Sequence, residues 1–206
     1  PAKNLPLFIQ YYACDSYLRG GTGDEYPMAV MAADGVAALC VDSVHQKGVT
    51  RETYDALKTY RIAVAGLTDE IQRLARLGVI DAARVGMGGL SFGSAVTMRM
   101  VTDTRLISAA SISSVQPEPI YYWYNHVHGA DFVQTLRSAW GLGAPDQTPE
   151  RWREVSPAAR VDEIATPILM QLPEQESRFN YELFGRLQDR GVPVEMVVFP
   201  DEPHIK

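Results

Sequence analysis

Residues 89–93 read Gly-Leu-Ser-Phe-Gly and lie between a short apolar run and a stretch with helical spacing. A glycine on each side of a serine relieves the crowding of a sharp strand-to-helix turn, which lifts the Ser91 hydroxyl out of the backbone. The helix that follows directs its first unpaired N–H groups toward any oxyanion formed beside the serine. The pattern therefore predicts a nucleophile elbow at the end of a sheet strand.

Apolar runs alternate with amphipathic stretches along the rest of the chain, which favours a parallel sheet. Helical spacing over residues 50–77 places Leu67, Ile71 and Leu74 on one apolar stripe. We expect an α/β fold, with a mostly parallel, doubly wound sheet and helices on both faces. The predicted strands span residues 7–12, 36–42, 85–90, 107–113, 167–172 and 194–199, and further helices span 26–33 and 181–190. Residues 121–161 form an aromatic-rich excursion between strands, with helical pieces over 133–140 and 149–154.

Composition narrows the class of protein. The chain has 206 residues and a formal net charge of −6, so it presents no basic face for nucleic acid or for an anionic membrane. No apolar run is long enough to span a bilayer. A neutral or cationic small substrate or peptide fits this charge better, whereas localisation and oligomeric state stay open. Cys14 and Cys40 are expected to be buried thiols, with a bridge between neighbouring strand ends as the alternative.

Residues 1–206 are expected to form one domain. A strand-like run begins almost at once, and the chain stops two residues after His204, where a closing helix would normally cover the sheet. We therefore expect a piece of a longer protein.

Polar residues follow three predicted strands in the order serine, acid, histidine, which is the order of an α/β-hydrolase triad. Ser91 is the expected nucleophile and His204 the base that accepts its proton. A carboxylate on the far nitrogen of the imidazole fixes its tautomer, and Glu176 is the expected acid. Glu174 and Asp201 are the competing candidates.

Three segments together resemble a known family. Residues 89–93, residues 167–178 (Pro-Ile-Leu-Met-Gln-Leu-Pro-Glu-Gln-Glu-Ser-Arg) and residues 197–204 (Val-Val-Phe-Pro-Asp-Glu-Pro-His) are similar to the catalytic domain of prolyl-oligopeptidase-type serine peptidases. That family usually has histidine-glycine where this chain has Leu172-Pro173, and an aspartate where it has Glu176. With a glutamate as the triad acid in this framework, the chain resembles the lasso-peptide isopeptidases.

The resemblance implies a bacterial hydrolase that opens the isopeptide bond of a lasso peptide, without a cofactor, and that carries an N-terminal β-propeller. It also implies a tyrosine hydroxyl as the second oxyanion donor beside the Phe92 N–H, for which Tyr12 is expected and Tyr11 is the reserve. Arg178 stands two residues after the acid and corresponds to a substrate-binding arginine, although a solvated surface arginine is the alternative.

The aromatic stretch over residues 121–128 can line a peptide pocket, with Trp123 and Tyr124 as the expected contacts. The alternative is a cap that packs on the sheet. His126 and His128 have no acidic or cysteine cluster beside them, so no metal site is expected. Two other functions stay open: peptidase, acylaminoacyl-peptidase or esterase action on linear substrates, and a non-catalytic binding module.

Overall fold

The described part of the protein contains a six-stranded parallel sheet. The computed structural model describes residues 3–14, 26–44, 46–50, 53–125 and 129–204. Within them the strands are ordered β2-β1-β3-β4-β5-β6, and every neighbouring pair is parallel. The strands are β1 (Leu5–Tyr12), β2 (Ala37–Asp42), β3 (Ile80–Gly89), β4 (Ala109–Ile112), β5 (Ile168–Pro173) and β6 (Val194–Phe199). The parallel sheet predicted from the sequence is confirmed.

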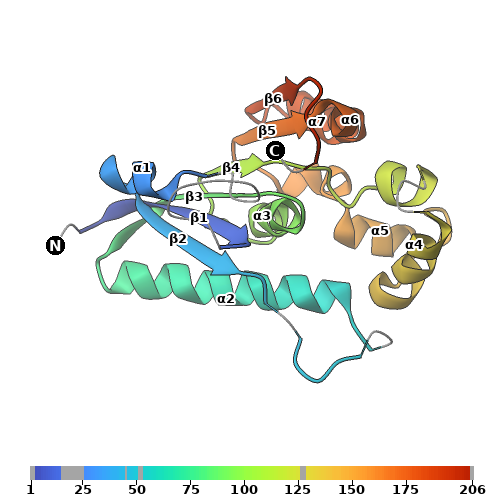
Figure 1. Cartoon of the computed structure of the whole chain (residues 1–206), viewed down its shortest axis with the longest axis horizontal. Helices are drawn as coiled ribbons and strands as arrows, with labels where there is room; N and C mark the ends of the chain where they lie inside the picture. The colour runs from blue at the N-terminus through green and yellow to red at the C-terminus, as the bar shows by residue number, and fades with distance from the viewer. Residues whose placement is uncertain (1–2, 15–25, 45, 51–52, 126–128, 205–206) are drawn as a thin grey trace.

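Helices lie on both sides of this sheet, as expected. Figure 1 shows α1 (Met28–Ala33) on one side and α2 (Ala56–Arg76) along the other. The remaining helices around the sheet are α3 (Phe92–Asp103), α6 (Glu174–Ser177), the 3₁₀ turn η4 (Arg178–Asn180) and α7 (Tyr181–Asp189).

The excursion between β4 and β5 extends beyond the carboxyl ends of the strands (Figure 1). Its elements are η1 (Ile120–Tyr124), α4 (Ala130–Thr135), η2 (Leu136–Trp140), α5 (Pro149–Val155) and η3 (Ala158–Glu163). The predicted helical pieces over 133–140 and 149–154 are present. The π-helical turn η1 and the 3₁₀ helix η3 were not predicted, because neither is long enough to establish a period.

Helix α2 is the longest described helix. It begins at Ala56 rather than at residue 50, because the Asp55 side chain caps it by accepting the N–H of Lys58 at 3.1 Å. Leu67 and Ile71 are buried and Leu74 packs against the core, so the predicted apolar stripe is confirmed. Neither α2 nor any other helix in the described ranges is long and apolar enough to cross a membrane.

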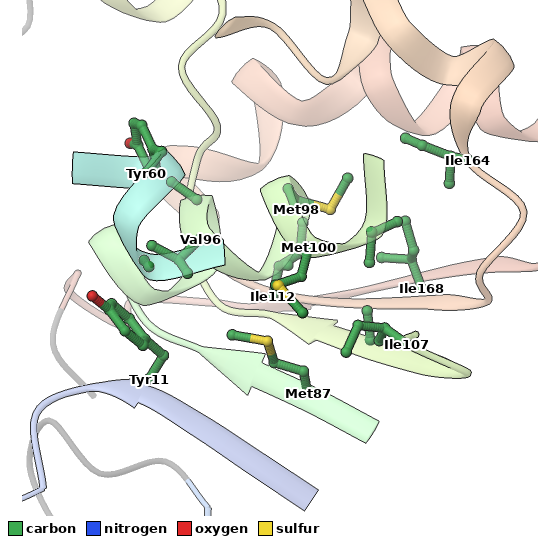
Figure 2. Close-up of a cluster of buried hydrophobic side chains, with 14 of the residues drawn as sticks. Tyr11, Tyr60, Met87, Val96, Met98, Met100, Ile107, Ile112, Ile164 and Ile168 are labelled. Carbon is green, nitrogen blue, oxygen red and sulfur yellow. The ribbon is translucent and has the colours of Figure 1, made fainter. Parts of the chain in front are cut away.

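Helix α3 is buried along almost its whole length, where it packs on β1, β3 and β4 and against α2 and η3. Figure 2 shows its Met100 beside Ile112 of β4 and near Met87 of β3, while Met98 lies farther from the strands. All four side chains are inaccessible to solvent. A helix enclosed on all sides cannot shift without opening the core, so the residue that precedes it is held firmly.

Cys14 and Cys40 form a disulfide, which corrects the expectation of buried thiols. The bridge was the alternative interpretation. Strands β1 and β2 pair with Gln10 opposite Cys40, and the chain after Tyr12 turns back over β2. The two Cα atoms therefore come within 5.8 Å, a separation that a disulfide spans.

Candidate active site

Ser91 occupies the turn between β3 and α3 in a conformation that side chains rarely adopt. Its φ is 52° and its ψ is −118°. Holding a non-glycine residue in such a region costs on the order of 1–3 kcal/mol and persists only where the surroundings impose it. The predicted sharp turn at this serine is present, and the buried strand and helix on either side maintain it.

The two glycines of the turn are required by close backbone contacts. A Cβ on Gly89 would lie 2.5 Å from the carbonyl carbon of Gly93, and a Cβ on Gly93 would lie 2.2 Å from the carbonyl oxygen of Tyr11. Atoms cannot approach so closely, and both contacts are with backbone rather than with a flexible side chain. The glycines thus let β3, α3 and β1 meet directly behind Ser91.

A buried hydroxyl that sequence reasoning missed ties the turn to the next strand. The Ser94 hydroxyl donates to the carbonyl oxygen of Gly89 at 2.5 Å and accepts the N–H of Ser113 at 2.9 Å. Ser114, one residue on, donates through its hydroxyl to the carbonyl oxygen of Ser91 at 3.3 Å. No sequence signal distinguishes these serines from others, because their role depends on where β4 ends.

Glu176 and His204 are in direct contact. Glu176 Oε1 lies 2.5 Å from His204 Nδ1, and Glu176 Oε2 accepts the N–H of Val115 at 3.3 Å. The Glu176 side chain is only 12% exposed, whereas the His204 side chain is 44% exposed. The carboxylate, which α6 carries directly after β5, is therefore fixed by the loop that follows β4, and the more open imidazole is oriented by it.

The competing acids lie elsewhere. Glu174 and Asp201 are both exposed, and Glu174 Oε2 accepts the backbone N–H of Asp201 at 3.5 Å. Asp42 accepts the N–H of Cys14 at 3.1 Å and so holds the loop that follows β1.

Ser91, Glu176 and His204 line one cavity of about 450 Å³. The other side chains around it are mostly aromatic or small: Tyr60, Phe92, Ala95, Ser114, Val115, Tyr121, Tyr122, Phe132 and Trp140. The nucleophile, acid and base candidates, which are far apart in the sequence, thus line the same cavity at the carboxyl edge of the sheet.

The aromatic rings form a continuous wall. Tyr60 packs against Phe92 and Trp140, with ring centroids 5.2 and 5.8 Å apart. Tyr122 meets Trp140 and Phe132 edge-on at 5.6 and 5.1 Å. Such tilted contacts suit the ring quadrupoles and give a rigid apolar surface.

The phenols of this wall stay neutral. Burial, and to a smaller extent the nearby charge of Glu176, raise the pKa of Tyr121 to about 12. Burial also raises the pKa of Tyr60 and of Tyr122 above the ordinary value for a phenol. The cavity therefore presents uncharged aromatic groups at any physiological pH.

Tyr12 and Tyr11 differ in how they approach the turn. Tyr12 is 41% exposed, has a φ of 126°, and sets its ring edge-on to Phe92 with centroids 5.8 Å apart. Tyr11 is buried, and its hydroxyl accepts the N–H of Val44 at 2.9 Å. Tyr12 is thus the more accessible neighbour of the elbow, while Tyr11 supports the loop after β2.

The expected substrate contacts fall outside the cavity lining. Trp123 packs edge-on against Trp152, and Tyr124 is 62% exposed. Arg178 is exposed, with its guanidinium carbon 4.6 Å from the centre of the Phe179 ring. The turn η1 instead directs Tyr121 and Tyr122 to the cavity, a choice that the run of four aromatic residues does not reveal. His126 and His128 lie outside the described residues.

Comparisons with known proteins point to one family. The profile described as the prolyl oligopeptidase family matches residues 27–206. Lasso peptide isopeptidase AtxE2 of Asticcacaulis excentricus is 30% identical over an alignment that covers 98% of this chain and 30% of that protein. Dipeptidyl aminopeptidase BIII of Pseudoxanthomonas mexicana is 28% identical over an alignment that covers 94% of this chain and 28% of that protein.

A solved structure gives the same picture. A variant of the AtxE2 isopeptidase with Astexin3-dC4 bound superposes with a TM-score of 0.86 at 28% identity, over 98% of this chain and 32% of that one. The agreement confirms the α/β-hydrolase fold. The chain spans less than a third of the length of the curated relatives that it matches.

Proposed function

Because the chain belongs to the prolyl oligopeptidase family, we propose that it is the catalytic part of a serine hydrolase that cleaves an amide bond. Ser91 is the nucleophile, His204 the general base and then acid, and Glu176 the residue that orients the imidazole. The contact of 2.5 Å between Glu176 and His204, on the same cavity as a strained serine, carries this proposal.

The contact supports one arrangement of the protons. With a carboxylate on Nδ1, the imidazole keeps its proton there, and Nε2 holds the lone pair that accepts the Ser91 proton during attack. The imidazolium that forms is stabilised by Glu176, which is already desolvated and held by Val115. Nε2–H then protonates the departing amine, and a water molecule releases the acyl group by the reverse sequence.

Two donors are proposed for the oxyanion. Phe92 is the first residue of α3, so its N–H belongs to the group without an intrahelical acceptor, and it directly follows the nucleophile. The second donor is the hydroxyl of Tyr12, whose exposure and contact with Phe92 leave it near the elbow. Stabilising the charge that develops on the carbonyl oxygen contributes about 3–4 kcal/mol per donor in other hydrolases.

The proposed substrate is a lasso peptide, and the bond is the isopeptide link between its N-terminal amine and an Asp or Glu side-chain carboxyl. The Ser91 hydroxyl would attack that side-chain carbonyl to form an acyl-enzyme, and hydrolysis of the acyl-enzyme would release a linear peptide. The similarity to lasso peptide isopeptidase AtxE2 over 98% of the chain supports this substrate. The neutral aromatic wall of the cavity fits apolar parts of a peptide.

The remaining parts of the proposal concern the whole protein. Since the chain spans 30% of AtxE2, we propose that residues 1–206 form the hydrolase domain of a longer protein with an N-terminal β-propeller. Arg178, which is exposed two residues after the acid, is proposed to hold a substrate carbonyl oxygen.

A second candidate is cleavage of linear peptides. The similarity to dipeptidyl aminopeptidase BIII and a cavity walled by aromatic rings favour it, because such a wall also accepts a proline or an apolar side chain.

The test uses the natural full-length protein and three substrates: a threaded lasso peptide, its unthreaded branched isomer, and a linear proline peptide. We expect the threaded peptide to be linearised. Ser91→Ala and His204→Ala should each reduce turnover by on the order of 10⁶-fold, as in other serine triads, while peptide binding persists.

Each other outcome identifies a different function. Cleavage of the linear peptide alone would favour the second candidate. Failure of the wild-type protein to react at Ser91 with a fluorophosphonate would instead indicate a non-catalytic binding module.

A further inference from the structure

Four aromatic residues of the cavity wall come from the excursion between β4 and β5. They are Tyr121, Tyr122, Phe132 and Trp140. The wall therefore depends on how the two ends of this excursion are held where they leave and rejoin the sheet.

One buried side chain joins these two ends. Glu118, which is 1% exposed, accepts the hydroxyl of Ser156 through Oε2 and the N–H of Ala158 at 2.8 Å through Oε1. The Ser156 hydroxyl in turn accepts the N–H of Ala159 at 3.2 Å. The carboxyl group thus makes two hydrogen bonds to residues that lie 38 and 40 positions later in the sequence.

The backbone of the same residue starts the turn that carries the tyrosines. The carbonyl oxygen of Glu118 accepts the N–H of Tyr121 at 3.1 Å and that of Tyr122 at 2.9 Å. Both rings extend from this turn to the cavity. A displacement of Glu118 would therefore be transmitted directly to two residues of the wall.

We propose that Glu118 is a positioning residue for substrate binding, which closes the base of the excursion and thereby places the aromatic wall beside Ser91. The proposal rests on the hydrolase function given above. Glu118 does not line the cavity that contains Ser91, so it acts through Tyr121 and Tyr122 and not on the reacting atoms.

The hydrogen bonds of Glu118 with Ser156 and Ala158 form a clamp, and this clamp tolerates a change in the protonation of the carboxyl group. Burial raises the pKa of Glu118 to about 7, while the hydrogen bonds from Ser156 and Ala158 lower it; Glu182 and Arg186 of α7 act on it more weakly. Glu150 and Arg153 of α5 line the adjoining cavity with Glu118 and Glu182.

When the carboxyl group is protonated, its hydroxyl can donate to Ser156, while the carbonyl oxygen still accepts from Ala158. The amide of a glutamine can make the same two bonds. An alanine makes neither, so the two substitutions separate the clamp from the charge.

The experiment compares Glu118→Ala and Glu118→Gln in the full-length protein, with Glu182→Ala as a matched control for a neighbouring acid. KM and kcat are measured on the peptide that the wild type cleaves, and a small fluorophosphonate reports the reactivity of Ser91. We expect Glu118→Ala to raise KM about tenfold or more, with kcat and labelling changed less than about threefold.

Glu118→Gln should keep the wild-type KM at both pH 6 and pH 8, and Glu182→Ala should have the KM and kcat of the wild type. An unchanged KM in a folded Glu118→Ala variant would overturn the proposal. So would an equal loss of kcat and labelling, which would indicate general disruption. If Glu118→Ala does not fold, Ser156→Ala removes one arm of the clamp and should raise KM by a smaller factor.

A second measurement keeps the clamp testable when no substrate is cleaved. Amide hydrogen exchange at Tyr121 and Tyr122 should accelerate in Glu118→Ala and stay slow in Glu118→Gln. Absence of wild-type activity on every peptide would refute the proposed function. Unchanged amide exchange at Tyr121 and Tyr122 in Glu118→Ala would instead refute the clamp.

Discussion

The elbow and the excursion both line the same cavity, yet they are held in different ways. The elbow is built from residues 89–94, whose backbone contacts leave space for glycine alone at two positions. The excursion is held by a buried carboxyl group and by ring contacts between residues far apart in the sequence. A nucleophile can thus be encoded by a short motif, whereas the surface that selects its substrate depends on long-range packing.

Both regions contain an energetically costly feature at the point where function is proposed. In the elbow the cost is the positive φ of Ser91, and in the excursion it is the burial of Glu118. The first is maintained by backbone packing and the second by hydrogen bonds. Substitutions in the two regions separate these two kinds of support.

After the loss of the nucleophile or the base, the largest effect is expected at the acid that orients the imidazole. Glu176→Ala should reduce kcat/KM by about 10⁴-fold, as the loss of the acid does in other triads, because the imidazole loses its orientation and its counter-charge. The measurement is steady-state kinetics on the peptide that the wild type cleaves.

Glu174→Ala is the matched control, since Glu174 is exposed and contacts the backbone of Asp201 rather than His204. It should change kcat/KM less than about threefold. A larger loss from Glu174→Ala than from Glu176→Ala would show that the acid role proposed for Glu176 belongs to Glu174.

The next effect concerns the backbone of the elbow. Gly93→Ala should destabilise the protein by about 4 kcal/mol or more, because the new Cβ would meet the Tyr11 carbonyl oxygen at 2.2 Å. Denaturant unfolding measures the free energy of unfolding, and fluorophosphonate labelling measures the loss of Ser91 reactivity.

Gly66→Ala serves as the control, because Gly66 lies in α2 with no atom within 4 Å of an added Cβ. Alanine is the better helix former, so this variant should be more stable by about 1 kcal/mol. Equal behaviour of the two variants would show that the elbow is not tightly packed.

The smallest effect concerns the charge of the clamp. The pKa of Glu118 is raised from 4.5 to about 7, so the folded state binds the proton more tightly than the unfolded state does. Its contribution to stability is therefore full below about pH 4.5 and is lost as the pH rises to about 7, for a total of about 3 kcal/mol.

Glu118→Gln cannot ionise and should escape this loss. Its free energy of unfolding should match that of the wild type at pH 4.5 and exceed it by about 3 kcal/mol at pH 8. A difference between the two proteins that does not vary with pH would contradict a raised pKa.

Several features followed from local patterns. The run over residues 85–90 ended in the turn at Ser91, and the spacing of Leu67 and Ile71 identified the buried side of α2. These elements repeat with a short period or contain glycine where only glycine fits, so neighbouring residues are enough to predict them.

Other features depended on contacts that no local pattern records. The disulfide required the pairing of β1 with β2, and the selection of Tyr121 and Tyr122 over Trp123 and Tyr124 required a π-helical turn. Trp140 and Tyr60 reach the cavity wall from η2 and α2, which meet only in the folded chain.

The amino-acid sequence by itself determined the strand-to-helix turn at Ser91, the parallel sheet behind it, and the order in which serine, acid and histidine occur. These are consequences of side-chain periodicity and of backbone sterics over a few residues. Only the tertiary structure decided that Glu176 rather than Glu174 contacts His204, which rings form the wall, and that a buried carboxyl group closes its base. Those choices depend on distances between residues brought together by folding, and burial then sets how strongly each charge and hydrogen bond acts.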